Sequence, residues 1–369
     1  MLSDELKSYI QGESAGLQIG IASVDGLAPQ EITDLSQLNT IMSRYTPFYS
    51  ADASVFQPRD FLDNAAAVVV LAFNYYFGRI NLPGSPPRGE IMNFYVIPEN
   101  LAYIAAKTQM VVDFLTARGY TAMQLATGVP VKMMTARSGI GAYGKNGIIQ
   151  TPAMGSWIGL NMVITDAPLE PGAPLDDPCG SCNLCQKACP TNALDEPYRC
   201  DIERCLTLHM LHNKGDIPHE MREKAGTCIA HCNICLDACP KNRKLQVQAE
   251  IPNPEGRVYP EIAPLVNISA KQYQQIFGDT FFEFLFIDRK YLQRNAAVAL
   301  GNYGDPQYLP VLIEALETQP EDMVRGYAAW ALGRIGTKTA KSALERNLKT
   351  DSAASAQAEI KHALEKLRH

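Results

Sequence analysis

The chain has 369 residues, a formal net charge of −6 and a hydrophobic fraction of 46%. These values are typical of a soluble globular protein with two or three domains, and they give no global attraction to nucleic acid. The first residues are charged, and the longest apolar stretch, near Ala65–Phe73, is too short to span a bilayer. We therefore expect a cytoplasmic protein with no membrane segment, in which thiols stay reduced.

The front region, residues 1–170, alternates helix-like and strand-like patterns. The stretch SDELKSYI predicts an opening helix capped by Ser3 or Asp4. Residues 100–120 carry apolar residues at helical spacing and meet a stop at Gly119. Runs of β-branched and aromatic residues predict buried strands at LQIGIASV (17–24), AAVVVLAFNYY (66–76) and SWIGLNMVIT (156–165). This order predicts an α/β or α+β domain.

The next region, residues 171–262, holds all ten cysteines. A first array with spacings of two, two and three residues ends in Cys-Pro, and a second array with spacings of two and three also ends in Cys-Pro. Bacterial two-cluster ferredoxins use the first pattern, and its fourth cysteine serves the other cluster. Zinc sites usually pair two C-x2-C hooks, and disulfides are rare in the cytosol. The spacing therefore favours two [4Fe–4S] clusters.

The ferredoxin-type exchange of ligands divides the cysteines into two sets. The first cluster receives Cys179, Cys182, Cys185 and Cys239. The second receives Cys189, Cys232 and Cys235, with Cys200, Cys205 and Cys228 as candidates for its fourth ligand. The surplus cysteines are interpreted as small buried residues. A bare ferredoxin needs no large front domain, so we expect the electrons to feed a reaction site within the first 170 residues.

The last region, residues 263–369, contains an internal repeat. Residues 296–304 realign with residues 328–336 at an offset of 32, and a degenerate third copy includes Ala363 and Leu364. Helical pairs of this kind stack into a short solenoid of HEAT-like repeats. Basic residues near the repeat helices form a candidate phosphate-binding face. Acidic residues are interspersed among them, so a solvated face with no binding role is an equal alternative. These basic residues are Arg289, Lys290, Arg294, Arg325 and Arg334.

Several segments together resemble the epoxyqueuosine reductase family, enzymes that complete queuosine in tRNA. They are SRYTPFYS, VVVLAFNYYFG, the stretch Arg137–Leu160, the two cysteine arrays in this order, YLQRNAAVALGN and the repeats. The resemblance covers nearly the whole chain, and the glycine-rich segment also resembles reductive dehalogenases. It implies a cobalamin-dependent oxidoreductase with an α/β front domain (1–170), a ferredoxin-like domain (171–262) and helical HEAT-like repeats (263–369).

The resemblance also implies roles for individual residues. Cys205 would complete the second cluster, and an external low-potential donor would supply electrons through both clusters to make Co(I) from base-off cobalamin. Glycines allow close approach of a bulky ligand, a lysine can meet a phosphate and an asparagine can bind an amide. The alternative interpretation is a glycine-rich turn between core segments. The candidate cobalamin-binding residues are Arg137, Gly139, Gly141, Gly144, Lys145, Asn146, Gly147 and Trp157.

The chain departs from the family where proton chemistry is expected. Alignment on Pro130 places Thr127 at the family's aspartate, and threonine is a poor general acid at neutral pH. Tyr143, in GAYGKN where the family has GWIGKN, is a candidate replacement, as are Tyr95, Tyr103 and Lys132. We therefore expect a divergent member, monomeric, with tRNA as a candidate partner of the repeats. The alternatives are a paralogous or dehalogenase-like reductase of a small molecule, or an electron-transfer protein.

Overall fold

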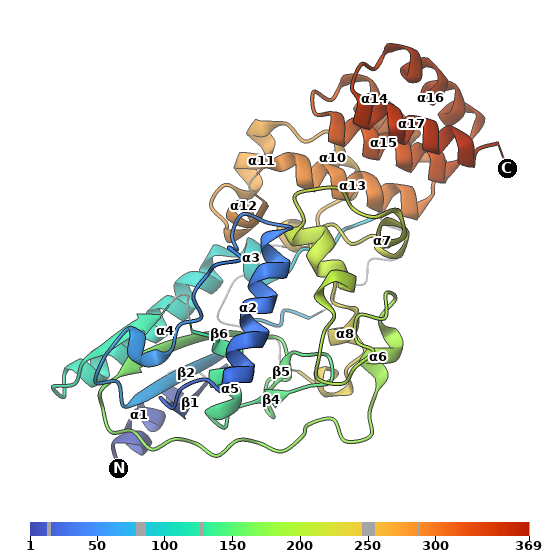
Figure 1. Ribbon diagram of the computed structural model, residues 1–369. Coiled ribbons are helices and arrows are strands. Elements are labelled where there is room, and N and C mark those ends of the chain that lie inside the picture. Colours follow the sequence, from blue (N-terminus) through green and yellow to red (C-terminus); the bar gives the residue numbers. More distant parts are fainter. Residues whose placement is uncertain (13–15, 79–85, 126–128, 246–254, 287, 369) are drawn as a thin grey trace. The chain divides into compact units, whose positions relative to one another are not determined.

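The computed structural model describes residues 1–12, 16–78, 86–125, 129–245, 255–286 and 288–368 (Figure 1). The chain divides into two compact units, and each unit draws on separated segments of the sequence. The first contains residues 1–79, 99–203 and 233–252, and the second contains residues 80–98, 204–232 and 253–369. No described helix is long and apolar enough to cross a membrane.

A sheet of four strands forms the centre of the first unit, in the order β1-β2-β6-β3 with every pairing antiparallel. Val69 of the fully buried β2 lies between Ile21 and Val163 of its two neighbours. The three predicted strands are confirmed, and the antiparallel pairing makes the unit α+β. The strands are β1 (Leu17–Ser23), β2 (Ala67–Asn74), β3 (Ala122–Leu125) and β6 (Ile158–Thr165).

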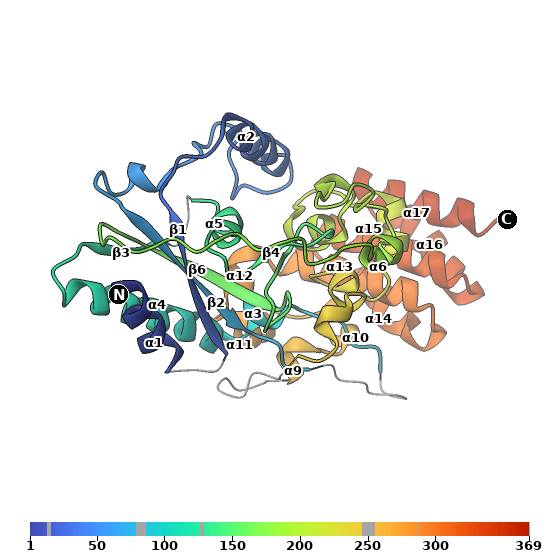
Figure 2. The ribbon, with the colours of Figure 1, turned by 90° about the horizontal axis from the view of Figure 1, so that it is seen from below.

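Helices cover both faces of this sheet (Figure 2). Val68 and Val70 pack in one core with Met134 of α5, because alternate residues of a strand point to opposite faces. Phe73 lies against Tyr103 of α4, with ring centroids 6.0 Å apart, on the other face. The helices are α1 (Leu2–Gln11), α2 (Pro29–Ser43), α4 (Pro98–Thr116) and α5 (Val131–Arg137).

Two predicted helix ends have different outcomes. The long helix α4 is followed by Gly119 with φ of 86°, as the sequence predicts. The predicted cap of the first helix is wrong: α1 begins at Leu2, and Ser3 lies inside it. The Ser3 hydroxyl is buried and accepts the Glu170 N–H at 2.8 Å, so it fixes a distant loop instead of the helix end.

The first unit also contains short elements around the cysteines. A hairpin of β4 (Ala142–Tyr143) and β5 (Ile149–Gln150) follows α5. One short helix begins within each cysteine array, α6 (Leu184–Ala188) and α8 (Ile234–Asp237). Single 3-10 turns lie at Pro58–Asp60, Ile202–Arg204 and Pro240–Asn242.

Helical repeats make up most of the second unit. Gly304 (φ 77°) ends α13 and Gly336 (φ 74°) ends α15. Each glycine N–H donates to the carbonyl four residues earlier, so the predicted stops are confirmed 32 residues apart. The repeat helices are α13 (Arg289–Tyr303), α14 (Leu309–Thr318), α15 (Asp322–Ile335), α16 (Lys338–Thr350) and α17 (Ala354–Lys366).

Shorter helices precede the repeats in this unit. A π-helical turn, Leu208–His212, follows Cys205 closely, and α7 (His219–Lys224) lies between it and Cys232. The others are α3 (Asn93–Val96), α9 (Glu255–Val258), α10 (Ile262–Val266), α11 (Ala270–Phe277), α12 (Phe281–Phe286) and a 3-10 turn, Pro306–Tyr308.

Candidate iron–sulfur site

Four cysteines from the two arrays line one small cavity of the first unit. They are Cys179, Cys182, Cys185 and Cys239, the set that the sequence spacing grouped. The remaining walls come from the β4–β5 hairpin and from Pro240. Among the described residues, no group of three or more His, Cys, Asp or Glu side chains is close enough to hold a metal ion. Four cysteine thiolates are the usual ligand set of a [4Fe–4S] cluster.

Asp177 shapes the loop that carries the first cysteines. Its carboxylate accepts the N–H groups of Cys179 at 2.9 Å and Gly180 at 3.0 Å. These backbone hydrogen bonds hold the pKa of Asp177 below its usual range. Gly180 has φ of 50°, a conformation that suits glycine, and the chain then turns into α6. The local sequence thus points the cysteines toward one space.

The β4–β5 hairpin donates to two of the sulfurs. The Lys145 backbone N–H lies 3.4 Å from Cys179 Sγ, and the Gln150 side-chain amide lies 3.7 Å from Cys239 Sγ. Such donors stabilise thiolates and tune cluster potentials. The Lys145 ammonium donates to the Gly180 carbonyl at 2.6 Å, so this lysine braces the cysteine loop. Gln150 was not predicted from the sequence; its place seven residues before Trp157 in the glycine-rich segment carries no recognisable pattern.

The cysteines of the cavity offer a set of thiolate ligands for iron. Burial raises the pKa of the Cys185 thiol, and the neighbouring Cys179 and Cys239 raise it further. Several thiolates in one half-buried space repel one another unless positive charge lies among them. Iron supplies that charge, and metal binding displaces the thiol protons. The donor set therefore fits a thiolate-ligated iron–sulfur cluster.

The glycines of the candidate cobalamin segment pack against the chain itself. A Cβ on Gly139 (φ 79°) would lie 2.5 Å from the Ala173 carbonyl oxygen, and one on Gly141 would lie 2.6 Å from Ile149 Cγ2. Gly147 (φ 69°) closes the hairpin with an N–H bond of 2.9 Å to Gly144, and the Asn146 side chain accepts the Ile148 N–H at 3.3 Å. These contacts favour the interpretation of the segment as a glycine-rich turn.

Tyr143 and Arg137 share a neighbour on α2. Arg137 forms an ion pair of 2.7 Å with Glu31 and donates to the Asp25 carbonyl at 3.0 Å. Burial raises the pKa of Tyr143 to about 12, and the Glu31 carboxylate adds to this effect. The Tyr143 phenol is therefore neutral at physiological pH. Thr127 lies outside the residues that the structure describes.

A second cavity of about 210 Å³ lies in the first unit beside the turn that follows Cys239. Trp157 is buried in its wall, with its ring 5.8 Å from Tyr75 and 5.6 Å from Tyr76. Two sequence signals could have indicated this cavity: the aromatic pair directly after β2, and the polar residues that follow the second Cys-Pro. The cavity is lined by Tyr76, Trp157, Leu236, Asp237, Asn242 and Arg243.

The remaining cysteines lie in both units. Cys189 and Cys235 belong to the first unit, and Cys205 and Cys232 belong to the second. The Cys228 thiol donates to the His231 carbonyl at 2.6 Å, and desolvation raises its pKa well above the usual value. This contact agrees with a structural role for Cys228.

Basic residues of the repeats are mostly paired within the second unit. Arg294 is fully buried and donates to backbone carbonyls, so it is not available to a phosphate. Arg325 forms a two-point ion pair with Asp351 at 2.6 and 3.0 Å. Lys290 and Arg334 lie 3.5 Å from Glu321 and 3.8 Å from Glu223. The prediction that Arg294 belongs to a phosphate-binding face is therefore wrong. The sequence of the repeat helix did not show that this arginine is buried.

Comparisons with known proteins agree with this site. Residues 178–242 match the family model of a 4Fe-4S double cluster binding domain, and residues 281–365 match HEAT repeats. The double-cluster match confirms iron–sulfur clusters over zinc and disulfides, and the second match confirms the repeats.

Two curated relatives are epoxyqueuosine reductases. The Bacillus subtilis protein is 35% identical over 271 residues, which cover 71% of this chain and 69% of that protein. The Listeria monocytogenes protein is 38% identical over 218 residues, which cover 58% of this chain and 56% of that protein. The alignment thus spans little more than half of the second relative.

Solved structures extend the similarity to the whole chain. A Bacillus subtilis epoxyqueuosine reductase, with its catalytic loop swung out of the active site, has a TM-score of 0.87, 30% identity and 99% coverage of both chains. An epoxyqueuosine reductase solved with an epoxyqueuosine-modified tRNA-Tyr stem loop has a TM-score of 0.88 and 29% identity, covering 100% of this chain and 99% of that one. With cysteines in the arrangement described above, the chain belongs to the epoxyqueuosine reductase family of oxidoreductases.

Proposed function

We propose that this protein reduces epoxyqueuosine to queuosine in tRNA, using two [4Fe–4S] clusters and base-off cobalamin. One observation carries the proposal: four cysteines from two separate arrays line one cavity against the hairpin that follows α5. The similarity over the whole chain to an enzyme solved with a modified tRNA stem loop supports the substrate.

We infer the ligand sets of the clusters from the cavity, the cysteine spacing and, for Cys205, the resemblance to the family. The first cluster would be held by the four cysteines of the cavity, with Lys145 and Gln150 as hydrogen-bond donors to sulfur. The second would be held by Cys189, Cys205, Cys232 and Cys235. Clusters of this type reach low potentials and transfer single electrons. An external low-potential donor would reduce them.

Residues of the first unit suit the edge of a corrin. The cavity beside Trp157 offers two aromatic rings and the guanidinium of Arg243, which fit an apolar macrocycle with amide groups at its rim. Its volume of about 210 Å³ accommodates only part of such a ligand. Cobalamin, once reduced, supplies a strong nucleophile or reductant. Trp157, Tyr76 and Arg243 would hold and orient it.

Proton delivery has a candidate in Tyr143. Reduction of an epoxide to an alkene releases its oxygen as water, so protons must reach that oxygen. The phenol of Tyr143 stays protonated throughout the physiological pH range, because burial and the nearby Glu31 carboxylate raise its pKa. Glu31 is itself held by the ion pair with Arg137. Thr127 cannot replace the family's aspartate in this role. We therefore expect turnover to be slower than in relatives that carry the acid.

The setting of the enzyme follows from its substrate. A tRNA-modifying reductase works in the cytoplasm, and we propose that this one does so as a monomer. Because Arg294 and Arg325 are engaged inside the second unit, tRNA contacts of the repeats would rely on other cations such as Arg289.

The direct test is an anaerobic assay on an anticodon stem loop that carries epoxyqueuosine. The protein is reconstituted with iron and sulfide, cobalamin is added, and queuosine is measured by mass spectrometry. Slow conversion that depends on both cofactors supports the proposal. A protein that binds base-off cobalamin and yet never converts the stem loop would favour a small-molecule substrate. Failure to take up cobalamin while the clusters are reduced reversibly would leave an electron carrier.

A further inference from the structure

Two limbs of the second unit carry Cys205 and Cys232, and both pack on the repeat helix α13. The limb after Cys205 forms the π-helical turn Leu208–His212 and runs on to Gly215. The other limb, after α7, leads through Ile229 to Cys232. The Cys232 N–H donates to Thr207 Oγ1 at 3.3 Å, so the limbs also meet directly beside the cysteines.

The end of the π-helical turn takes its hydrogen-bond donors from side chains. Carbonyls in the last turn of a helix have no partner inside the helix. The His209 carbonyl accepts from Arg294 at 3.3 Å, and the Met210 carbonyl accepts from Asn295 at 2.5 Å. The Leu211 carbonyl accepts from the Lys214 ammonium at 2.8 Å. Two adjacent residues of α13 therefore hold this turn in place.

Asn295 connects the two limbs. Its side-chain nitrogen donates to the Met210 carbonyl and also, at 2.7 Å, to the Ile229 carbonyl. Both amide hydrogens are thus used. Its oxygen accepts from Arg294 Nε at 3.0 Å, and the side chain is fully buried. One saturated, inaccessible amide ties the backbone after Cys205 to the backbone before Cys232.

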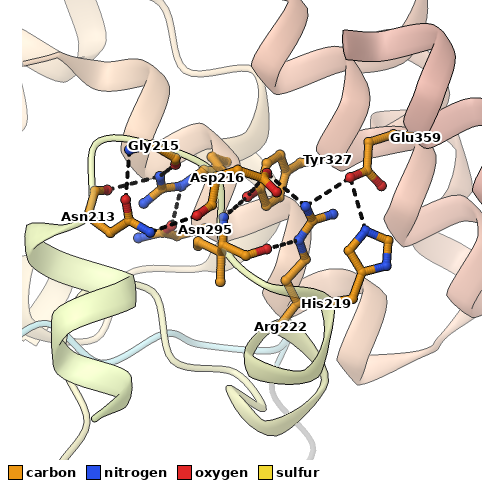
Figure 3. Close-up of polar contacts among 10 residues, drawn as sticks. Asn213, Gly215, Asp216, His219, Arg222, Asn295, Tyr327 and Glu359 are labelled. Atoms are coloured by element: carbon orange, nitrogen blue, oxygen red, sulfur yellow. Dashed lines mark hydrogen bonds and ion pairs between the residues drawn. The ribbon is translucent and has the colours of Figure 1, made fainter. Parts of the chain in front are cut away.

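Arg294 supports the same limb from beside Asn295. Its guanidinium donates to the carbonyls of Asn213 at 3.0 Å and Gly215 at 2.8 Å. Figure 3 shows Asn213 and Gly215 beside Asn295. A buried guanidinium with carbonyl partners is costly to disturb, because removal leaves several acceptors without donors.

We propose that Asn295 is a positioning residue for the second iron–sulfur cluster. By holding the Met210 and Ile229 carbonyls on one amide, it sets the separation at which Cys205 and Cys232 can serve the same cluster. The first repeat helix is then part of the cluster site as well as of the solenoid. The inference rests on the ligand set proposed above. Mutation of groups that hold metal ligands in place commonly lowers metal affinity about 10- to 100-fold.

The test follows the release of iron to a chelator from the full-length, anaerobically reconstituted protein. The variants Cys205→Ser and Cys239→Ser first show which phase of release belongs to which cluster. In Asn295→Ala two buried carbonyls lose their donor. We expect the phase missing in Cys205→Ser to become about 10- to 100-fold faster, and the other phase to stay at the wild-type rate.

Asn302→Ala is the matched control. Asn302 lies on the same helix and also donates to two carbonyls, Arg222 at 2.7 Å and Gly226 at 3.0 Å, but these lie in α7 and directly after it, so Asn302 does not connect the two limbs. It should release iron like the wild type. If Asn295→Ala does not fold, Asn295→Ser should give a smaller acceleration of the same phase.

Two other results would contradict this role of Asn295. If an Asn295 variant releases iron at the wild-type rate, Asn295 does not position the second cluster. If both phases of release become faster to the same degree, Asn295 has a general structural role instead. If the Cys205→Ser protein keeps both phases of iron release, Cys205 is not a ligand of the second cluster, and the positioning role of Asn295 is refuted with it.

Discussion

Gly301 of α13 and Gly333 of α15 lie 32 residues apart and make the same contact in successive repeats. A Cβ on Gly301 would lie 2.8 Å from Ala331 Cα, and one on Gly333 would lie 2.7 Å from Ala363 Cβ. The partners Ala331 and Ala363 are themselves 32 residues apart. Stacking of the repeats therefore depends on a glycine at one position of each unit.

Alanine at either glycine should destabilise the repeats. Alanine normally favours a helix by about 1 kcal/mol over glycine. Here the added methyl group must push two helix backbones apart, at a cost of about 1 to 3 kcal/mol. We expect Gly301→Ala and Gly333→Ala to lower the free energy of unfolding, measured by urea denaturation followed by circular dichroism.

Gly326→Ala is the control for this prediction. Gly326 lies on α15, but a Cβ there would first meet Glu359 Cγ, at 3.3 Å, and the nearest backbone atom, Ala356 Cα, only at 3.7 Å. This substitution should be neutral or stabilising. Stabilisation by all three alanines alike would show that helix propensity outweighs the close contact.

The Arg325–Asp351 pair should contribute stability that disappears in acid. The hydrogen bond from Arg325 holds the pKa of Asp351 below its usual range. Stability from such a carboxylate is present above its unfolded pKa of about 3.9 and is lost as pH falls through the folded pKa. Arg325→Gln should cost about 1 to 3 kcal/mol at neutral pH and flatten the acid limb of the stability profile. Thermal unfolding between about pH 3 and pH 7 measures both effects.

An exposed pair supplies the comparison. Arg346 lies 3.2 Å from Glu317, with side chains 62% and 42% exposed. Arg346→Gln should change stability by less than about 1 kcal/mol. Equal losses for the two arginine variants would show that burial does not distinguish the pairs.

The repeats and the first cysteine set were predictable because each depends on a local pattern. Glycine stops at a fixed offset and apolar residues at helical spacing fixed the positions of Gly304 and Gly336. The exchange of ligands between ferredoxin arrays placed Cys239 with Cys179, although 60 residues separate them.

The parts that were missed depend on packing at a distance. Arg294 has a polar side chain, yet it lies in a run of α13 that is buried from Leu292 to Gly301. Its partners come from residues 209–215, about 80 residues earlier. No local pattern could distinguish it from the more exposed Lys290. Gln150 was missed for the same reason, since only the folded hairpin brings it to Cys239.

Gln150 should tune the potential of the first cluster. Its amide donates to Cys239 Sγ at 3.7 Å, and such donors stabilise the more negative, reduced state. Gln150→Leu should therefore make one midpoint potential more negative and leave the other unchanged, as measured by a redox titration followed by EPR. Gln186→Leu is the control, because Gln186 adjoins Cys185 and yet donates to the Leu194 carbonyl at 2.7 Å. Unchanged potentials in a fully loaded Gln150→Leu protein would contradict this role.

Tyr143 and Thr127 should determine how reduction depends on pH. A tyrosine donor whose pKa is about 12 stays protonated, so wild-type turnover should be flat between about pH 6 and pH 9. Tyr143→Phe should reduce single-turnover rates by about 10² to 10⁴, the usual contribution of a positioned general acid.

Thr127→Asp restores the carboxyl group that the family carries and tests the same proton path from the other side. It should raise the rate at low pH and introduce a decline as pH rises, because a carboxylic acid donates only while it is protonated. In the double variant with Tyr143→Phe, this aspartate should recover part of the lost rate. A full rate in Tyr143→Phe with the flat profile unchanged would exclude the phenol as donor and turn attention to Lys132 or to water.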